Sequence, residues 1–558
     1  MTDGIERTWT RHYADGVPAD IEVADASLVD LFEDSVARFD DEVALEFFGA
    51  ETTFASLAGQ VGAAAEGLRR LGVVAGDRVA LVLPNCPQHI VAFHAILRLG
   101  AVVVEHNPLY TASEMAHQLD DHRATVAVVW DKAVHLVRGS GSVDTVISVD
   151  LTRAMRRTTR LALRLPVPKA RASRAALTAC APGTVPWQAL LSHGELAEGH
   201  PRPRAADLAV IQYTSGTTGV PKGAMLTHRN LRTNAAQGRA WVPGLVDGRE
   251  VIYAVLPMFH AYGLTLCLNF ALSIGARLAL FPRFDVDLVL AAARRHPPTF
   301  LPAVPPIYER LARAAEERGV DLSSVRFAIS GAMSLPAGTL ELWERVTGGL
   351  LIEGYGLTET SPVAIGNPLG RDRRAGAIGV PFPNTEIRVV DPDDPTTDRA
   401  PGERGELLIR GPQVFEGYWE KPDETRNAFV GDGWFRTGDI VQVDPDGFVS
   451  IVDRLKEIII TGGFNVMPSE VEAVLRRHPD VADAAVVGLP RGDGSEDVVA
   501  AVQLGPGRAL DADGIREHCR AHLAAYKVPR RVVALDELPR SLIGKVLRRQ
   551  VRDSLIEG

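Results

Sequence analysis

Apolar residues recur at two characteristic spacings along the first 130 residues of the chain. In "SLVDLFEDSVARF" they fall at Leu28, Leu31, Phe32, Val36 and Phe39, on one face of a helix, and the "VALEFF" that follows has the apolar run of a strand. The alternation continues through "GDRVALVLP" (strand), "QHIVAFHAILRLG" (helix), "AVVVEHNP" (strand), a helix from about Ser113, and "TVAVVW" (strand). Short apolar strands separated by longer helices indicate parallel βαβ units with both sheet faces covered. The pattern therefore predicts an α/β fold.

The pattern changes toward the carboxyl end. A polar, Pro-rich loop spans Pro392 to Gly405, and "GELLIRG" and "GFVSIVD" read as strands of a β-rich region. After "VDRLKEIIITGGFNV" a new pattern begins: helix "PSEVEAVLRRH", strands "DAAVVGLP" and "DVVAAVQL", and helix "ADGIREHCRAHL". We therefore predict a large N-terminal domain of βαβ sheets with a β-rich subdomain, residues 1–453, and a small α+β C-terminal domain, residues 454–558.

Composition limits the size of the core and the class of partner. A chain of 558 residues is too long for one ordinary core, and its 46% hydrophobic and 23% charged residues are typical of soluble globular proteins. The formal net charge of −10 and the pI near 5.9 argue against a nucleic-acid partner, because such proteins usually carry a basic domain or stripe. We expect no nucleic-acid binding.

Three further features indicate a cytoplasmic location. The four cysteines lie far apart without the CxxC spacing of a zinc or redox site, so we expect free thiols in a reducing compartment. The N-terminus lacks the apolar core of a signal peptide. The longest apolar stretch, residues 264–280, is interrupted by Asn269 and Arg277 and is shorter than a bilayer span, so no transmembrane helix is expected.

One basic segment interrupts the α/β pattern. Residues 151–193 contain no Asp or Glu and eight basic residues: Arg153, Arg156, Arg157, Arg160, Arg164, Lys169, Arg171 and Arg174. Residues 151–174 could form a peripheral contact with the anionic inner face of a membrane. The alternative is a solvated surface insertion, because charged runs are commonly just exposed. The sequence leaves both interpretations open.

A run rich in glycine and hydroxyl residues, "YTSGTTGVPKGAMLTH", spans residues 213–228. A strand precedes it and "LTHRNLRTNAAQGRA" begins a helix, so the pattern predicts strand, glycine loop and helix, an arrangement that binds phosphate through backbone amides and the helix dipole. The run differs from a Walker P-loop, because Lys222 is flanked by Pro221 and Gly223. As a loop residue, Lys222 is expected to contribute little to core packing.

Seven ordered motifs together resemble one known family. They are "YTSGTTGVPKG", "LPMFHAYG", "SGAMSLP", "EGYGLTETSPV", "GWFRTGDI", "DRLKEIIITGGFNVMPSEVE" and "LPRSLIGKVLRR". They resemble the signature motifs of the adenylate-forming superfamily, which contains acyl-CoA synthetases, non-ribosomal adenylation domains and firefly-type luciferases. In that family a carboxylate attacks the α-phosphate of ATP to give acyl-AMP and pyrophosphate, and the thiol of coenzyme A then displaces AMP.

The resemblance implies a role for each matching residue at the nucleotide. The triphosphate would be held by Thr214, Ser215, Gly216, Thr217, Thr218 and Lys222. Glu359 would bind Mg²⁺, Thr358 would reach the α-phosphate, and Asp439, supported by Arg454, would accept the ribose hydroxyls. Tyr355 would stack on adenine, within backbone from Gly331, Ala332, Glu353 and Gly354.

The resemblance also implies a small domain that moves. Lys545 would bridge carboxylate and phosphate during adenylation, and would be withdrawn when the domain rotates about a hinge near Lys456. Coenzyme A would then meet Gly462, Gly463, Phe464 and Arg283.

Two further stretches and one position in the last motif indicate the class of acid substrate. "EHNPLYTASEMAHQLDD" and "GPQVFEGYWEKPDET" look most like the medium- and long-chain fatty acyl-CoA synthetase branch, as does Ile543 in place of the hydroxyl residue that many relatives have before Gly544. His260 would lie beside the acyl carboxylate, and the expected acyl channel is small or apolar: Tyr262, Leu264, Val304, Gly331, Ala332, Gly356 and Val363.

Three functions stay open at this point. The favoured one is a fatty acid–CoA ligase. The second keeps adenylation but uses another acid, such as a 4-coumarate-like aryl acid, or loads an acyl-carrier protein. The third, a non-catalytic lipid-binding scaffold, is opposed by the intact Lys222, Glu359, Asp439 and Lys545. The sequence does not decide acyl chain length, nor whether the protein is a homodimer.

Overall fold

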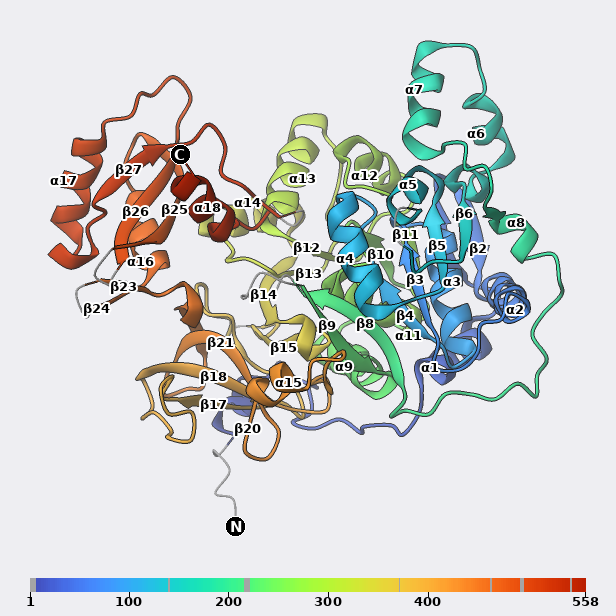
Figure 1. Cartoon of the computed structure of the whole chain (residues 1–558), viewed down its shortest axis with the longest axis horizontal. Coiled ribbons are helices and arrows are strands. Elements are labelled where there is room, and N and C mark those ends of the chain that lie inside the picture. Colours follow the sequence, from blue (N-terminus) through green and yellow to red (C-terminus); the bar gives the residue numbers. More distant parts are fainter. Residues whose placement is uncertain are drawn as a thin grey trace.

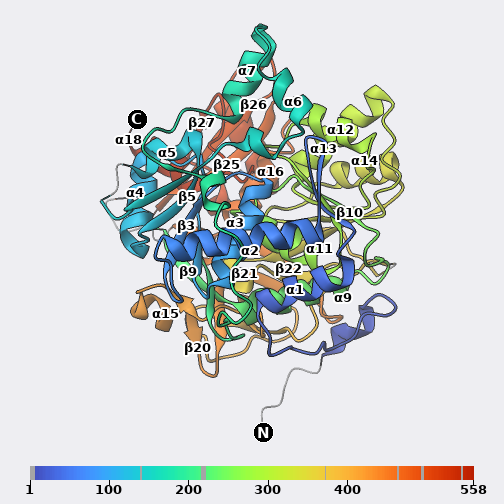
Figure 2. The ribbon, with the colours of Figure 1, turned by 90° about the vertical axis from the view of Figure 1, so that its right-hand side faces the viewer.

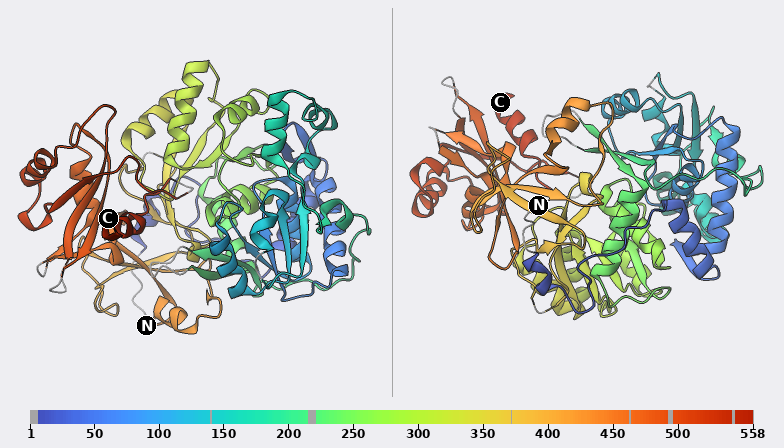
Figure 3. Two further views of the ribbon diagram at one scale, coloured as in Figure 1. Left: turned by 45° about the horizontal axis from the view of Figure 1, so that its top comes forward. Right: turned by 90° about the horizontal axis from the view of Figure 1, so that it is seen from below.

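The structure is a computed structural model that describes residues 7–138, 141–214, 221–370, 372–461, 464–491, 496–541 and 544–557. Three large sheets and their helices form the N-terminal part, and the C-terminal part lies at one end of the molecule (Figure 1). Two further directions of view show the same separation (Figure 3). The expected α/β body with a small α+β domain is confirmed.

The first sheet has nine strands, and its central strands are parallel. In spatial order they are β16 (Val380–Pro381), β15 (Val363–Gly366), β14 (Leu350–Gly356), β13 (Phe327–Ser330), β12 (Phe300–Ala303), β10 (Val251–Ala254), β11 (Arg277–Leu280), β1 (Val43–Phe47) and β2 (Ala50–Thr53). The central strands are almost entirely buried, as expected for a parallel sheet covered on both faces.

The second sheet has eight strands, six of which form a parallel ladder that includes the strands predicted at "GDRVALVLP", "AVVVEHNP" and "TVAVVW". In spatial order they are β19 (Gly417–Tyr418), β9 (Lys222–Thr227), β8 (Leu208–Thr214), β4 (Val102–Glu105), β3 (Arg78–Val82), β5 (Val126–Trp130), β6 (Thr145–Val149) and β7 (Val185–Pro186). The βαβ prediction for this region is correct.

The predicted strand–loop–helix order around Lys222 is wrong. The chain returns from the glycine run as strand β9, antiparallel to β8, and only then begins helix α9 (His228–Trp241). Residues of β9 pair with β8 on one side and β19 on the other, and this pairing stabilises "KGAMLT" as a strand. The first amides of α9 are already satisfied by a capping box between Thr227 and Asn230. A helix N-terminus therefore does not follow the glycine run directly.

A helical layer lies between the two sheets. Helix α1 (Leu28–Phe39) contacts α2 (Phe54–Arg70), α3 (Pro87–Arg98), α9 and α11 (Phe270–Ser273). Of these, α2 and α11 contact strands of the first sheet, whereas α3 and α9 contact strands of the second. Figure 2 shows α1 and α2 near the front of the molecule. The largest apolar core of the protein joins these helices to both sheets.

The remaining helices of the N-terminal part lie mainly outside this layer. They are α4 (Ala112–His122), α5 (Val134–Val137), α6 (Arg157–Ala162), α7 (Pro168–Leu177), α8 (Trp187–Leu190), α10 (Ala261–Gly263), α12 (Val286–Ala293), α13 (Pro305–Arg318), α14 (Ala337–Thr347) and α15 (Pro422–Ala428). No helix in the described part of the chain combines the length and apolar character needed to cross a bilayer.

The predicted β-rich region is a third, antiparallel sheet. Its strands are β17 (Glu386–Val390), β18 (Arg404–Arg410), β20 (Phe429–Val430), β21 (Trp434–Val443) and β22 (Val449–Arg454). Strand β22 ends at the predicted domain boundary, so the last strand of this sheet leads directly into the C-terminal part.

The C-terminal part has its own small sheet and its own apolar core. Its elements are β23 (Ile459–Thr461), β24 (Phe464–Val466), α16 (Pro468–Leu475), β25 (Val481–Pro490), β26 (Glu496–Leu504), α17 (Ala512–His522), β27 (Arg531–Ala534) and α18 (Arg548–Glu557). Val471, Leu475, Val486, Val502 and Ile515 are fully buried in a cluster separate from the main core. The boundary at residues 453/454 and the mobility of this domain stay predictions.

Candidate active site

The ends of the glycine run meet across a β-hairpin. Thr214, the last residue of β8, pairs with Lys222, the first residue of β9. Four residues predicted to hold the triphosphate, Ser215, Gly216, Thr217 and Thr218, lie outside the described residues. The structure therefore fixes both ends of the predicted phosphate loop at one edge of the second sheet.

Lys222 is more constrained than a loop lysine. Its side chain is buried, forms an ion pair with Glu424 of α15, and has its ammonium 5.2 Å from the centre of the Tyr418 ring. The expectation of little packing is wrong, because β9 places the residue inside the sheet and beneath the β19–α15 segment. The hydroxyl of Tyr418 in turn donates to Oε1 of Glu359 at 2.8 Å.

Glu359 lies in a short 3₁₀ turn, Thr358–Thr360, after β14. Its carboxyl is buried, and burial raises its pKa, whereas the Tyr418 hydroxyl and the Arg454 charge favour the ionised form. Thr358 is half-buried beside it. In the described part of the chain, no group of three or more His, Cys, Asp or Glu could hold a metal alone. A metal at Glu359 would therefore need oxygen ligands from a substrate.

A second buried cluster joins Tyr355, Asp439 and Arg454. The Tyr355 hydroxyl donates to Oδ2 of Asp439 at 2.5 Å, and Nε of Arg454 lies 3.1 Å from Oδ1 of the same carboxylate. The pairing of β21 with β22 creates this contact, because it sets Asp439 directly opposite Arg454. Burial next to Asp439 raises the pKa of the Tyr355 phenol, so Tyr355 stays neutral and donates.

The predicted adenine-binding backbone lies at the carboxyl ends of two adjacent parallel strands. Gly331 and Ala332 follow β13, and Glu353 and Gly354 lie within β14. Ala332 has φ of +67°, a left-handed conformation that is costly for a residue with a side chain and is often found at functional sites. Burial raises the pKa of the Glu353 carboxyl, which accepts a hydrogen bond from the Leu335 amide at 2.9 Å.

Of the predicted acyl residues, Tyr262 and Gly331 lie against each other. Its hydroxyl donates to the carbonyls of Ile329 at 2.6 Å and Ala303 at 3.2 Å. A Cβ at Gly331 would lie only 3.0 Å from the Tyr262 ring, so glycine is needed for this close approach.

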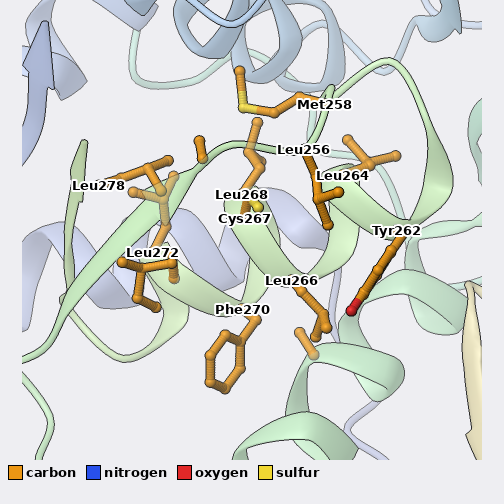
Figure 4. Close-up of a cluster of buried hydrophobic side chains, with 14 of the residues drawn as sticks. Leu256, Met258, Tyr262, Leu264, Leu266, Cys267, Leu268, Phe270, Leu272 and Leu278 are labelled. Atoms are coloured by element: carbon orange, nitrogen blue, oxygen red, sulfur yellow. The ribbon is translucent and has the colours of Figure 1, made fainter. Parts of the chain in front are cut away.

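The rest of the expected acyl channel is apolar. Leu264, Val304 and Val363 are buried, whereas Gly356 is exposed. Leu264 begins a π-helical turn, Leu264–Asn269, and Figure 4 shows Tyr262 and Leu264 at one end of the apolar cluster that this turn contributes to. Such π-helical turns are frequent at functional sites.

His260 caps the turn that carries Tyr262. Its Nδ1 accepts a hydrogen bond from the Tyr262 amide at 3.2 Å, and burial lowers the pKa of the imidazole to about 4. The ring is therefore neutral at pH 7. The backbone of the same loop is hydrogen-bonded to β8, the strand that leads into the predicted phosphate loop. Nε2 of Gln212 donates to the Phe259 carbonyl at 2.9 Å.

Lys545 reaches the N-terminal part from the small domain. Gly544 has φ of +81°, and a Cβ there would lie 3.4 Å from Pro306 at the start of α13 and 3.9 Å from the sulfur of Met333. Burial and the charge of Arg454 lower the pKa of Lys545 to about 8, whereas Glu457 and Asp439 oppose that shift. The structure therefore brings Lys545 into the electrostatic field of the Asp439–Arg454 pair.

Arg548 links the small domain to the strand before the predicted hinge. Its guanidinium donates to both oxygens of Glu472 at 2.7 Å and to Oγ of Ser469 at 2.8 Å. It also bonds to Glu457 and lies 3.4 Å from Oδ1 of Asp453, the penultimate residue of β22. The side chain is largely buried, and its carboxylate partners raise its pKa, so the guanidinium stays charged.

The predicted hinge and coenzyme A residues are only partly placed. Lys456 lies in the turn Leu455–Glu457, where burial and the nearby charge of Lys222 lower its pKa. Gly462, Gly463 and the Phe464 side chain lie outside the described residues. Arg283 has a side chain 76% exposed, 3.6 Å from Asp285. No contact in the described part of the chain joins Arg283 to the other site residues.

Three contributors to the site were not predicted from the sequence. Tyr418 and Glu424 occur in "GYWEKPDET", a stretch that indicates the subfamily but does not point to a role for either residue. Arg548 occurs in the same motif as Lys545. Its neighbour Arg549 is also an arginine, so the sequence alone does not show which of the two is buried.

Comparison with known proteins gives matches along nearly the whole chain. Residues 32–419 match the family model "AMP-binding enzyme", and residues 470–545 match "AMP-binding enzyme C-terminal domain". A long-chain-fatty-acid–CoA ligase of Salmonella typhimurium strain LT2 is 39% identical over 98% of both chains. A 4-coumarate–CoA ligase of Oryza sativa subsp. japonica is 34% identical over 91% of this chain and 88% of its own.

The fold also matches solved structures. The crystal structure of ATP-bound MatB from Rhodopseudomonas palustris superposes with a TM-score of 0.79 at 30% identity, covering 94% of this chain and 98% of that one.

The Arg548 cluster gives a stability prediction. Arg548→Lys keeps the charge but loses the two-pronged contact with Glu472 and leaves buried carboxylates incompletely paired. We expect a loss of about 2 kcal/mol in the local stability of the small domain, the scale of a lost hydrogen bond to a charged group. Hydrogen–deuterium exchange of peptides covering α16 would report it as faster exchange.

Arg549→Lys is the matched control, because Arg549 is exposed and lies 3.7 Å from Asp553. Its effect should stay within about 0.5 kcal/mol. Equal exchange in the two variants would contradict the role assigned to Arg548.

Proposed function

The chain belongs to the AMP-binding enzyme family and is an ATP-dependent acid–thiol ligase, and from that premise we propose that its acid is a medium- or long-chain fatty acid. We propose coenzyme A as the thiol. The choice of acid rests on one observation: the predicted acyl residues Leu264, Val304 and Val363 are buried and apolar, and the nearby His260 is neutral, so no charged side chain is offered to the acyl chain. Each CH₂ transferred from water to such a surface contributes about 0.8 kcal/mol.

The fatty acid is favoured over an aryl acid by similarity. The long-chain-fatty-acid–CoA ligase match has the higher identity and the greater coverage of the two relatives described above. An aryl acid stays the second candidate, because a 4-coumarate–CoA ligase matches at 34%. An acyl-carrier protein as acceptor stays a further alternative.

In the first half-reaction, the acid carboxylate would attack the α-phosphate of ATP. Lys222 and the hydroxyl groups of the glycine run would hold the β- and γ-phosphates, where negative charge grows as pyrophosphate leaves. Thr358 would donate to the α-phosphate. Lys545, as a compact cation, would draw the two reacting anions together and lower their mutual repulsion.

The nucleoside would be held by the Tyr355–Asp439–Arg454 cluster. Asp439 is an acceptor already oriented by Arg454, so it can receive both ribose hydroxyls without losing its ion pair. Adenine would stack on Tyr355, beside the backbone of Gly331 and Ala332. The existing contacts keep these groups in place before substrate binds, which reduces the ordering cost of binding.

Glu359 fits a magnesium site. Mg²⁺ is commonly bound through one or two carboxylates plus substrate phosphates, and the described residues offer one buried carboxylate here rather than a complete protein cage. Bound Mg²⁺ would neutralise phosphate charge. The Tyr418 hydroxyl would orient the Glu359 carboxylate toward it.

In the second half-reaction, the thiol of coenzyme A would displace AMP from the acyl group. We propose that the small domain first rotates about Lys456, which withdraws Lys545 and brings Gly462, Gly463 and Phe464 to the acyl-AMP. Arg283, exposed on the surface, would meet a phosphate of coenzyme A.

We also propose a cytoplasmic enzyme that associates with the inner face of a membrane through residues 151–174. Its fatty acid substrates partition into membranes, so this location would place the enzyme at their source. A homodimer stays a prediction without structural support.

A ligation assay over C2 to C20 acids and cinnamates tests the proposed acid. We expect coenzyme A-dependent pyrophosphate release and thioester formation to be greatest with medium or long alkyl acids. Thioester formation from cinnamates but from no alkyl acid would overturn the fatty acid proposal in favour of the aryl one. Release of pyrophosphate without any acyl-CoA would point to a different acceptor.

Lys545→Ala should separate the two half-reactions. We expect acyl-AMP formation to fall by at least about 10²-fold, because a charge acting mainly in the transition state is removed. Thioester formation from supplied acyl-AMP should stay within about threefold of the wild type, because the residue is withdrawn in that step. Single-turnover assays of each half-reaction measure this, and an equal loss of both would refute the two-conformation mechanism.

The pKa of Lys545 near 8 predicts a pH dependence. The ammonium is required for adenylation, so kcat/KM for acyl-AMP formation should fall about tenfold per pH unit above pH 8. Arg stays protonated throughout this range, so Lys545→Arg should remove the decline, whatever its absolute rate. A wild-type profile that is flat to pH 10 would contradict the assignment.

A further inference from the structure

Helices α6 and α7 form a hairpin that projects from the N-terminal part, at the top of the molecule in Figures 1 and 2. It contains most of the basic segment, in which residues 151–177 include eight Lys or Arg and no Asp or Glu. Neither helix buries a residue. The hairpin therefore contributes little to the core, and its basic side chains lie at the surface of the molecule.

The base of the hairpin is anchored to the second sheet. The indole Nε1 of Trp130, at the end of β5, donates to the Leu177 carbonyl at 2.9 Å. Lys132 donates to the Ala175 carbonyl at 2.7 Å, and Thr178 bonds to Asp131. Helix α7 thus leaves the body at a fixed point.

Four arginines converge at this base. Arg153, Arg160, Arg164 and Arg174 line a hollow of about 20 Å³, together with Asp150, Thr152 and Leu163. Asp150 is the one acidic residue of the lining, lies 3.6 Å from Arg153, and accepts from the Thr152 amide and hydroxyl. Among the described residues, no carboxylate lies within 4.0 Å of a guanidinium nitrogen of the other three arginines. The hollow carries an excess of positive charge and has room for an anionic oxygen.

Large apolar side chains are exposed next to these arginines. Leu161 is 63% exposed, Leu165 54% and Val167 46%, and all three lie in the second half of α6 or the turn that follows it. Most large apolar residues of a soluble surface occur singly, whereas three within seven positions beside a basic cluster are typical of a segment that enters a lipid interface.

We propose that the α6–α7 hairpin is a docking site for anionic phospholipid. Arg160, Arg164 and Arg174 bind headgroup phosphates at the hollow, and Leu161, Leu165 and Val167 enter the acyl boundary above them. Charge complementarity favours this partner, because an apolar protein surface would leave the arginines unpaired, whereas an anionic phospholipid offers both phosphate and hydrocarbon. The inference rests on the membrane association proposed above and names its binding groups; docking needs neither ATP nor coenzyme A, so its failure is distinguishable from a failure of the ligase reaction.

Vesicle co-sedimentation of the full-length protein tests the proposal. We expect binding to vesicles of phosphatidylcholine with 30% phosphatidylglycerol, weak binding to phosphatidylcholine alone, and loss of binding as salt is raised. Each basic residue near an anionic surface contributes about fivefold in affinity. Arg160→Gln/Arg164→Gln/Arg174→Gln should therefore lower the partition coefficient by at least about tenfold, and Leu161→Ser/Leu165→Ser/Val167→Ser should lower it as well.

Matched controls lie elsewhere on the surface. Arg313→Gln and Arg204→Gln remove exposed arginines of α13 and of the segment before β8, and Leu109→Ser removes an apolar side chain that is 66% exposed. These variants should bind vesicles like the wild type. Thermal melting and ligation of a short, water-soluble acid should be unchanged in all variants, because none alters the predicted site.

Three outcomes would overturn the proposal. The first is equal sedimentation of the wild type with neutral and anionic vesicles. The second is wild-type binding by the triple arginine variant, which would make the segment a solvated insertion. The third is complete release of the protein from vesicles by inorganic phosphate at constant ionic strength, which would identify a site for a free anion instead of a membrane.

Discussion

The position of Lys545 depends on a guanidinium three residues after it. Arg548 bonds to Glu457, Glu472 and Ser469 and approaches Asp453, so one side chain connects both sides of the predicted hinge to helix α16. Three carboxylates around one guanidinium satisfy charges that would be costly to bury alone. Because Asp453 belongs to the last strand of the β-rich sheet, this cluster sets the distance between that sheet and the small domain.

Electrostatics inside the site follow from that placement. Lys545 enters a region that already contains Arg454, and the combination of burial with a like charge moves its pKa toward neutrality. Asp439 and Glu457 limit the shift. A lysine in this condition is held less tightly than one with a dedicated carboxylate partner, which suits the withdrawal from the site that the proposed domain rotation requires. The anions of the substrates would supply the missing charge and favour its return.

The predicted acyl-binding region, unlike the charged region around Lys545, is neutral and largely apolar. His260 is neutral, Tyr262 places its hydroxyl on two backbone carbonyls, and the neighbouring π-helical turn is buried and largely apolar. The Tyr262 hydroxyl is satisfied by these carbonyls, whereas both polar atoms of the Asn269 side chain, at the end of the turn, are buried without a hydrogen-bond partner among the described residues. The same division between charge and hydrocarbon recurs at the α6–α7 hairpin, where exposed arginines and exposed leucines lie next to each other.

The sequence by itself determined the βαβ units of the N-terminal part and the residue types available for the candidate site. Apolar spacing was sufficient for β3, β4 and β5 of the parallel ladder, and the ordered motifs were sufficient for the family, for Tyr355, Glu359 and Asp439 as site candidates, and for Lys545 in the C-terminal part. Only the tertiary structure decided that β9 separates the glycine run from α9, because a six-residue segment becomes a strand only when β8 and β19 lie on either side of it. It also decided that Tyr418 contacts Glu359 and Glu424 pairs with Lys222, that Arg548 rather than Arg549 is buried, and that Arg153 and Arg174 share one hollow. Each of these depends on contacts between residues distant in sequence, and local patterns of side chains carry no information about which distant surface will meet them.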